Sequence, residues 1–203
     1  MKILTFTILK SFFFVTLLFI ISCNKKESII EPPPTKPTYI VPLGLDNQWT
    51  FIRTEYDTLG IVTRIDTINY TIVKDTLIGN QQWFKANYSP FYYYNDSQGL
   101  WRWNPYAKLA YKYPAKVGDT FFNDYLREVK VISIDTLINT SIGELSCYQY
   151  QLDLYGFKTN NFLAPGFGFV SMEEAARLYA PYPRLTPPFL FARWEMISAN
   201  VKE

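Results

Sequence analysis

The stretch that decides the fold is Cys147-Tyr-Gln-Tyr-Gln-Leu-Asp-Leu-Tyr155, in which apolar and polar side chains alternate. Successive side chains of a β-strand point to opposite faces of the sheet. One face of this segment therefore carries Tyr148, Tyr150, Leu152 and Leu154. The two glutamines and Asp153 share the opposite face. One dry face and one wet face are typical of a strand in an antiparallel sheet.

The same pattern extends outward from this segment. In Lys108–Tyr113, we expect Leu109, Tyr111 and Tyr113 to oppose Lys108, Ala110 and Lys112. Stretches rich in β-branched and aromatic residues predict further strands over 48–57, 61–74, 82–88, 91–94, 99–103, 127–138, 167–172 and 191–201. Turn residues separate them at 59–60, 78–80, 95–99 and 141–143. The prediction is an all-β fold, either an antiparallel sandwich or a strongly curved, half-barrel sheet, with at most one short helix.

The one helical candidate is Ser171–Tyr179. Ser171 and Glu174 match a capping box, and Ala175 to Leu178 are fair to strong helix formers. The alternative is a strand that runs from Phe167 into Met172 and is followed by a loop. The stretch 180–188 contains four prolines and cannot be a central strand.

A faint internal duplication runs through the chain. The segments 42–51 and 114–122 both begin with proline, pass through a turn and end in an aromatic strand. Each is followed by an Asp-Thr-Leu-Ile element, at 75–78 and at 135–138. Two related β-meanders would explain this pattern, and chance similarity between hairpins is the alternative.

The first 22 residues have the pattern of a lipoprotein signal peptide. Lys2 and Lys10 flank the start of an apolar run over 12–21, which is too short to span a bilayer as a helix of ~20 residues. Ile20-Ile21-Ser22-Cys23 resembles a bacterial lipobox, which implies cleavage after Ser22 and lipid attachment at Cys23. Residues 23–38 then form a lipidated, proline-rich tether, and residues 39–203 form a single β-rich domain.

The amino-acid composition excludes several classes of functional site. The 203 residues include no histidine, which removes His-dependent nucleophilic sites and His-ligated metals. Without Lys2 and Lys10 the 20 basic residues become 18, equal to the 18 acidic ones, so no basic field for nucleic acid remains. Cys147 is expected to be a small core residue rather than a nucleophile, because no histidine can activate it. No metal-binding loop or cofactor motif is present, and we predict no cofactor and no catalytic residue.

Aromatic residues are concentrated between Gln82 and Tyr113, where 12 of 32 residues are Phe, Trp or Tyr. Alternation places Tyr92 and Tyr94 on the face opposite Phe91 and Tyr93, so the rings cannot all enter one core. Exposed Trp and Tyr rings suit stacking on sugars or contact with a protein partner. The candidate ligand-binding residues are Trp83, Tyr92, Tyr94, Trp101, Arg102 and Trp103. The alternative is that these rings pack a wide core.

Three groups of motifs together resemble uncharacterised envelope lipoproteins of Gram-negative bacteria. They are a proline-led Asp-Asn-x-Trp opening over 42–49, a central Tyr-Pro-x-x-x-Gly-Asp over 113–119 and a closing Ala-Pro-Gly-x-Gly-x-Val over 164–170. The resemblance covers about residues 40–201 and implies a compact β-rich domain on a lipid anchor, at the outer membrane. It supplies no activity and no catalytic residues. Phe167 and Phe169 stand where smaller aliphatic residues are more usual.

Three hypotheses about function follow. The first is a non-catalytic binding module that holds a glycan or another small ligand on the aromatic residues. The second is a structural or accessory subunit of an envelope complex. The third is a carboxylate-dependent hydrolase, which needs two acidic side chains converging in a cleft. Its candidate residues are Asp96, Asp119, Asp124, Glu128, Asp153, Glu173 and Glu174.

Overall fold

The computed structural model describes residues 37–123, 128–154, 156–176 and 189–202. All of them belong to one compact unit of the chain, Lys36–Glu203. The described residues form one antiparallel sheet of 12 strands. No helix that could cross a membrane occurs among them.

The sheet consists of two six-stranded meanders. The first contains β1 (Gln48–Tyr56), β2 (Val62–Ile78), β3 (Gln81–Ala86), β4 (Tyr92–Asp96), β5 (Gly99–Trp103) and β6 (Ala107–Lys112). The second contains β7 (Thr120–Phe122), β8 (Glu128–Thr140), β9 (Gly143–Leu154), β10 (Phe157–Ala164), β11 (Gly168–Ala176) and β12 (Phe189–Asn200). Each strand pairs with the next within its meander, and β1 pairs with β12 to join the two. The two Asp-Thr-Leu-Ile elements lie near the ends of β2 and β8, the second strand of each meander. The two elements therefore occupy corresponding strands of the two meanders.

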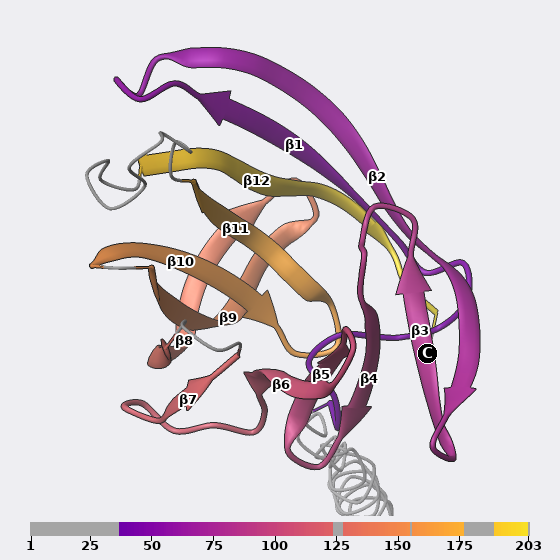
Figure 1. Ribbon diagram of the computed structural model, residues 1–203. Coiled ribbons are helices and arrows are strands. Elements are labelled where there is room, and N and C mark those ends of the chain that lie inside the picture. Colours follow the sequence, from indigo (N-terminus) through magenta and orange to yellow (C-terminus); the bar gives the residue numbers. More distant parts are fainter. Residues whose placement is uncertain (1–36, 124–127, 155, 177–188, 203) are drawn as a thin grey trace, which may run out of the picture. The chain divides into compact units, whose positions relative to one another are not determined.

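The sheet curls into a half-barrel rather than folding into two stacked layers (Figure 1). Its curvature is consistent with register shifts in β1, β2 and β8, because a bulge bends its strand and increases the local twist. The half-barrel prediction is thus confirmed, and the sandwich alternative is wrong.

The core fills the inner face of the sheet. Tyr148, Tyr150 and Leu152 are all buried, which confirms the alternation predicted for β9. Tyr150 of β9 also contacts the edge strand at the far end of the sheet, because its hydroxyl donates to the main-chain carbonyl of Lys112 in β6 over 2.7 Å. The edge strands β6 and β7 contact each other, and we call this place the seam of the sheet. An ion pair of 2.8 Å between Lys112, at the end of β6, and Asp119, just before β7, lies there.

The segment Pro37–Asn47, which we call the N-terminal strap, is fastened to the sheet by side chains. Tyr113 donates its hydroxyl to the Pro37 carbonyl over 2.8 Å, and Asn95 donates its amide to the Val41 carbonyl over 2.7 Å. Ile40 is fully buried within the strap. The strap therefore contributes to the core. Its end is also bonded to β2, because the Asp46 N–H donates to the Ile72 carbonyl over 3.0 Å and the Ile72 N–H donates to the Asn47 carbonyl over 2.9 Å.

Two local predictions are wrong. Ser171 to Ala176 belong to β11, not to a helix, because pairing with both β10 and β12 outweighs the capping-box pattern; residues 177–179 lie outside the described residues. Leu109 does not share a face with Tyr111, because a register shift places Leu109 opposite Trp101 and Tyr111 opposite Leu100.

Candidate functional site

Five of the six predicted ligand-binding residues lie together on one face of β3, β4 and β5. The pairing of Tyr92 with Trp103 and of Tyr94 with Trp101 places these four rings on the same side of the sheet. Trp83 joins them from β3, with its ring centroid 4.9 Å from that of Tyr94 and 5.6 Å from that of Trp103. We call these five residues the outer aromatic layer, because the opposite face of the same strands carries core residues such as Leu100.

The five rings of the layer differ in burial, with Trp83 beneath and the other four rings partly exposed above it. Trp83 is only 3% exposed, whereas Tyr92, Tyr94, Trp101 and Trp103 are half-buried. Tyr94 and Trp101 stack with an interplanar angle of 28° and centroids 6.5 Å apart. The layer therefore offers partly open, flat apolar surface supported from below by a buried indole.

Polar groups border the outer aromatic layer. Tyr94 donates its hydroxyl to Asp96 over 2.7 Å, and the ammonium of Lys85 lies 5.4 Å from the centre of the Tyr92 ring. Burial raises the pKa of Tyr94 to about 12, and the hydrogen bond to Asp96 and its charge add to this effect. Burial alone would raise the pKa of Asp96, but hydrogen bonds from the Tyr94 hydroxyl and from the Gln98 and Gly99 backbone N–H groups lower it. Asp96 is therefore a carboxylate at neutral pH.

Arg102 is separated from the other five residues. It pairs with Tyr93, so it lies on the inner face of the sheet. Its guanidinium stacks over the Phe91 ring at 4.9 Å and donates to the Asn123 carbonyl over 2.5 Å. The structure therefore places Arg102 at the seam of the sheet rather than beside the outer aromatic layer. Cys23, the predicted lipidation site, lies outside the described residues.

A second feature, which the sequence did not predict, is a cavity of about 210 Å³ on the inner face. We call it the interior pocket. Trp49, Phe51, Tyr70, Met172 and Trp194 line it together with the strap residues Val41 and Leu43. The alternation of Trp49 and Phe51 in β1 marks an inward face, but only the fold brings that face together with β11, β12 and the strap.

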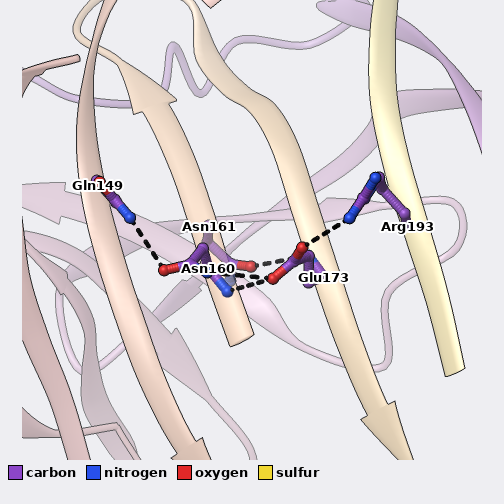
Figure 2. Close-up of polar contacts among 5 residues, drawn as sticks. All are labelled: Gln149, Asn160, Asn161, Glu173 and Arg193. Carbon is purple, nitrogen blue, oxygen red and sulfur yellow. Dashed lines mark hydrogen bonds and ion pairs between the residues drawn. The ribbon is translucent and has the colours of Figure 1, made fainter. Parts of the chain in front are cut away.

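The acidic candidates mostly hold the structure together. Figure 2 shows Glu173 in a polar network across four neighbouring strands: it accepts from the backbone N–H of Asn160 at 2.7 Å and from Arg193 at 3.1 Å. Asn160 in turn accepts from Gln149 at 3.0 Å. Glu174 points to the other face, where it pairs with Arg53 at 3.5 Å and lines the interior pocket. The two neighbouring glutamates therefore do not converge on one cleft.

The remaining candidates lie elsewhere. Asp119 pairs with Lys112, and hydrogen bonds from Lys112 and from the Lys116 backbone lower its pKa. Asp153 accepts from the Gly156 N–H at 2.6 Å in a turn, and Glu128 is exposed at the start of β8. Asp124 lies outside the described residues. In the described part of the chain, no three Cys, Asp or Glu side chains gather as a metal site would require.

No protein-family model matches the chain, and no curated protein matches it. The fold is similar to a crystal structure described as that of a "putative lipoprotein" from Parabacteroides distasonis. The two share 12% sequence identity and a TM-score of 0.41, over 81% of this chain and 99% of that chain.

Proposed function

We propose that the protein is a lipid-anchored protein of the cell envelope whose β-domain binds carbohydrate on the outer aromatic layer. The observation that carries the proposal is the position of five large rings on the face of β3–β5 that points away from the core. The outer face of an antiparallel sheet is normally polar. An aromatic outer face therefore needs a reason beyond folding.

The chemistry of the layer suits a sugar. Trp and Tyr combine a flat apolar face with a polar edge, and such side chains suit contacts that are dry on one side and wet on the other. Trp101 and Trp103 would stack on the apolar face of a sugar ring. The carboxylate of Asp96 and the ammonium of Lys85 lie at the border, where they can bond to sugar hydroxyls. Trp83, being buried, would support the surface without touching the ligand.

The binding experiment uses the full-length protein in detergent. A glycan array identifies ligands, and titration calorimetry then measures their affinity for the wild type, Trp101→Ala and Trp103→Ala. Phe122→Ala is the matched control, because Phe122 is an aromatic residue of β7 that is 66% exposed and lies outside the layer. We expect the two tryptophan variants to lose at least about fivefold in affinity, since residues that anchor a contact typically contribute more than ~1 kcal/mol.

Two results would refute carbohydrate binding. One is a protein that binds no glycan on a broad array. The other is an affinity that Trp101→Ala and Trp103→Ala leave unchanged or that Phe122→Ala lowers equally.

The lipid anchor has its own test. Mass spectrometry of the native protein should find a diacylglyceryl group on Cys23 and no residue before it. Cys23→Ser should move the protein from the membrane fraction to the soluble fraction or leave the signal peptide uncleaved, because two or more acyl chains hold a protein on a bilayer stably. An unmodified Cys23 in the native protein would overturn this part of the proposal.

The role of an accessory subunit is a second candidate, favoured by the end of the β1–β2 hairpin. Leu59, Ile61 and Ile65 are 82%, 59% and 65% exposed there. Clustered exposed aliphatic side chains mark interaction surfaces. If this surface binds an envelope protein, purification of the native protein recovers that partner in stoichiometric amount, and the double variant Leu59→Ser, Ile61→Ser loses it.

A further inference from the structure

The interior pocket is formed jointly by the two meanders and the strap. Of the 16 described residues that line it, eight are aromatic. β1 supplies Trp49 and Phe51, and β12 supplies Trp194. The connection between β3 and β4 brings Tyr88 to the rim, where it is 62% exposed. The pocket therefore has aromatic walls and a border that reaches the surface.

Aromatic walls of this kind attract cations. The face of an aromatic ring carries partial negative charge, and a cation within about 6 Å of the ring centre is held by it. Two wall rings already have a guanidinium of the protein at such a distance. Arg53 lies 5.2 Å from the centre of the Trp194 ring, and Arg102 lies 4.9 Å from that of Phe91.

Glu174 is the charged residue in the described lining of the pocket. The other polar side chains of the lining are the hydroxyls of Ser89 and of three tyrosines. Burial raises the pKa of Tyr70 well above its usual value, and the neighbouring Tyr93 adds to the rise, so this phenol is neutral at physiological pH. The lining therefore carries negative charge at neutral pH and no positive charge.

The carboxylate of Glu174 is only loosely held by the protein. Its contact with Arg53 is 3.5 Å long, whereas a charge-assisted hydrogen bond is about 2.7–2.9 Å. Arg53 is bonded more closely to Glu55, and the Glu174 side chain is 45% exposed. The two glutamates and the arginine together keep one net negative charge, which a cationic group can neutralise.

The volume of the pocket limits the size of a ligand. An apolar cavity of about 150 Å³ accommodates benzene. At about 210 Å³, the interior pocket has room for a ring of that size and a short chain. A bare ammonium ion would leave the apolar walls unfilled, so the cation must carry an apolar group.

We infer that the interior pocket binds a small arylalkyl ammonium compound, with its ring between the aromatic walls and its ammonium beside the Glu174 carboxylate. Because Glu174 is partly exposed, the ammonium keeps part of its hydration and avoids the full cost of burying a charge. This site lies on the inner face of the sheet, so it is independent of carbohydrate binding on the outer aromatic layer.

The test compares 2-phenylethylamine with 2-phenylethanol. The two compounds have the same number of non-hydrogen atoms, but only the amine is positively charged at neutral pH. Titration calorimetry measures both affinities for the full-length protein in a non-ionic detergent. All variants are measured at one detergent concentration, so partitioning of the compounds into micelles cancels in the comparison.

The indole N–H signals of the isotopically labelled protein show where the compounds bind. Of its five tryptophans, Trp49 and Trp194 line the interior pocket, whereas Trp83, Trp101 and Trp103 belong to the outer aromatic layer. Each signal is assigned from the corresponding Trp→Phe variant. We expect the amine to shift the signals of Trp49 and Trp194 and to leave the other three in place.

We also expect the amine to bind more tightly than the alcohol. Glu174→Gln keeps the shape of the side chain and removes its charge, so it should weaken binding of the amine about fivefold and leave that of the alcohol unchanged. Glu195→Gln is the matched control. Glu195 is an exposed glutamate that follows Trp194 in β12 and therefore points to the opposite face of the sheet, so its substitution should change neither affinity.

Four results would overturn the inference: the amine does not bind, it binds no more tightly than the alcohol, it shifts only the signals of the outer aromatic layer, or Glu174→Gln weakens it no more than Glu195→Gln does. Should Glu174→Gln fail to fold, the wild-type affinities and signal shifts still decide. A protein that binds no glycan leaves all of these measurements unaffected.

Discussion

Asn47 is the residue whose substitution tests the packing of the strap most directly. It is fully buried, and its side chain joins segments that are far apart in the sequence. Its amide donates to the Pro42 carbonyl over 3.1 Å and, more weakly, to the Lys202 carbonyl over 3.5 Å. Its carbonyl oxygen accepts from the Lys202 N–H at 2.8 Å. The strap and the C-terminal end of the chain are thus fastened by one side chain.

The expected loss follows from these contacts. Asn47→Ala removes two good hydrogen bonds and leaves the Pro42 carbonyl and the Lys202 N–H without their Asn47 partner, the first in a buried site and the second in a partly buried one. A lost hydrogen bond costs about 1 kcal/mol and a stranded buried group about 1–3 kcal/mol, so the free energy of unfolding should fall by about 2–4 kcal/mol. For a domain of this size, that corresponds to a fall in Tm of about 10 °C.

Urea unfolding followed by tryptophan fluorescence measures the effect, with Asn139→Ala as the control. Asn139 is an exposed asparagine of β8, and its substitution should change the stability by less than about 0.5 kcal/mol. Equal urea midpoints for Asn47→Ala and the wild type would refute the reasoning, because the strap would then be held by its other contacts, such as the Tyr113–Pro37 and Asn95–Val41 hydrogen bonds.

Asn47→Asp sharpens the test. At neutral pH its carboxylate could still accept from Lys202, but it would face the Pro42 carbonyl as a second acceptor. On acidification the protonated carboxyl could donate again. The gap in stability to the wild type should therefore narrow as the pH falls, and a gap that widens would contradict the assigned geometry.

Three further predictions concern the tyrosines and the cysteine. Tyr150→Phe loses the 2.7 Å bond to β6 and should destabilise the domain by about 1–2 kcal/mol in urea unfolding, whereas Tyr148→Phe should change it by less than about 0.5 kcal/mol. Burial raises the pKa of Cys147 to about 12, so a disulfide reagent at pH 8 should react with this thiol only after unfolding; prompt reaction would place it at the surface. Tyr94 has a folded pKa of about 12 against 10.0 in the unfolded chain. The stability that the raised pKa of Tyr94 contributes to the folded state is therefore complete below pH 10 and is lost as the pH rises toward 12. The difference in unfolding free energy between Tyr94→Phe and the wild type should shrink over that range. A constant difference would show that the phenol does not ionise as assigned.

Strand periodicity correctly predicted which side chains share a face of the sheet in strands whose side chains alternate regularly between the inner and the outer face. In β4, alternation alone placed Tyr92 and Tyr94 opposite Tyr93, and the structure confirms it: Tyr94 contacts Trp83 on the outer face, while Tyr93 bonds to Ser89 beside the interior pocket. The same rule, applied to Trp101-Arg102-Trp103, would have separated Arg102 from the two tryptophans. Alternation in this segment is therefore enough to place Arg102 on the other face.

Other features depend on contacts that no local pattern contains. β10 was missing from the predicted strands because its centre, Lys158-Thr-Asn-Asn161, has low β propensity. It forms because strands pair with it on both sides and because Asn161 turns inward, where its amide donates to the Tyr111 hydroxyl over 2.6 Å. The interior pocket was missed for a similar reason, since its walls come from both meanders and the strap.

The aromatic run between Gln82 and Tyr113 is explained by a sheet that is apolar on both faces. Its inner face supplies Phe91 and Tyr93 to the wall of the interior pocket, and its outer face carries the outer aromatic layer. Within that layer the burial differs: Trp83 is enclosed, so its loss would leave a cavity and cost stability. Trp101 and Trp103 are half-buried, so their truncation removes less packing. A binding defect in those two variants would therefore report the loss of a contact surface rather than the loss of the fold.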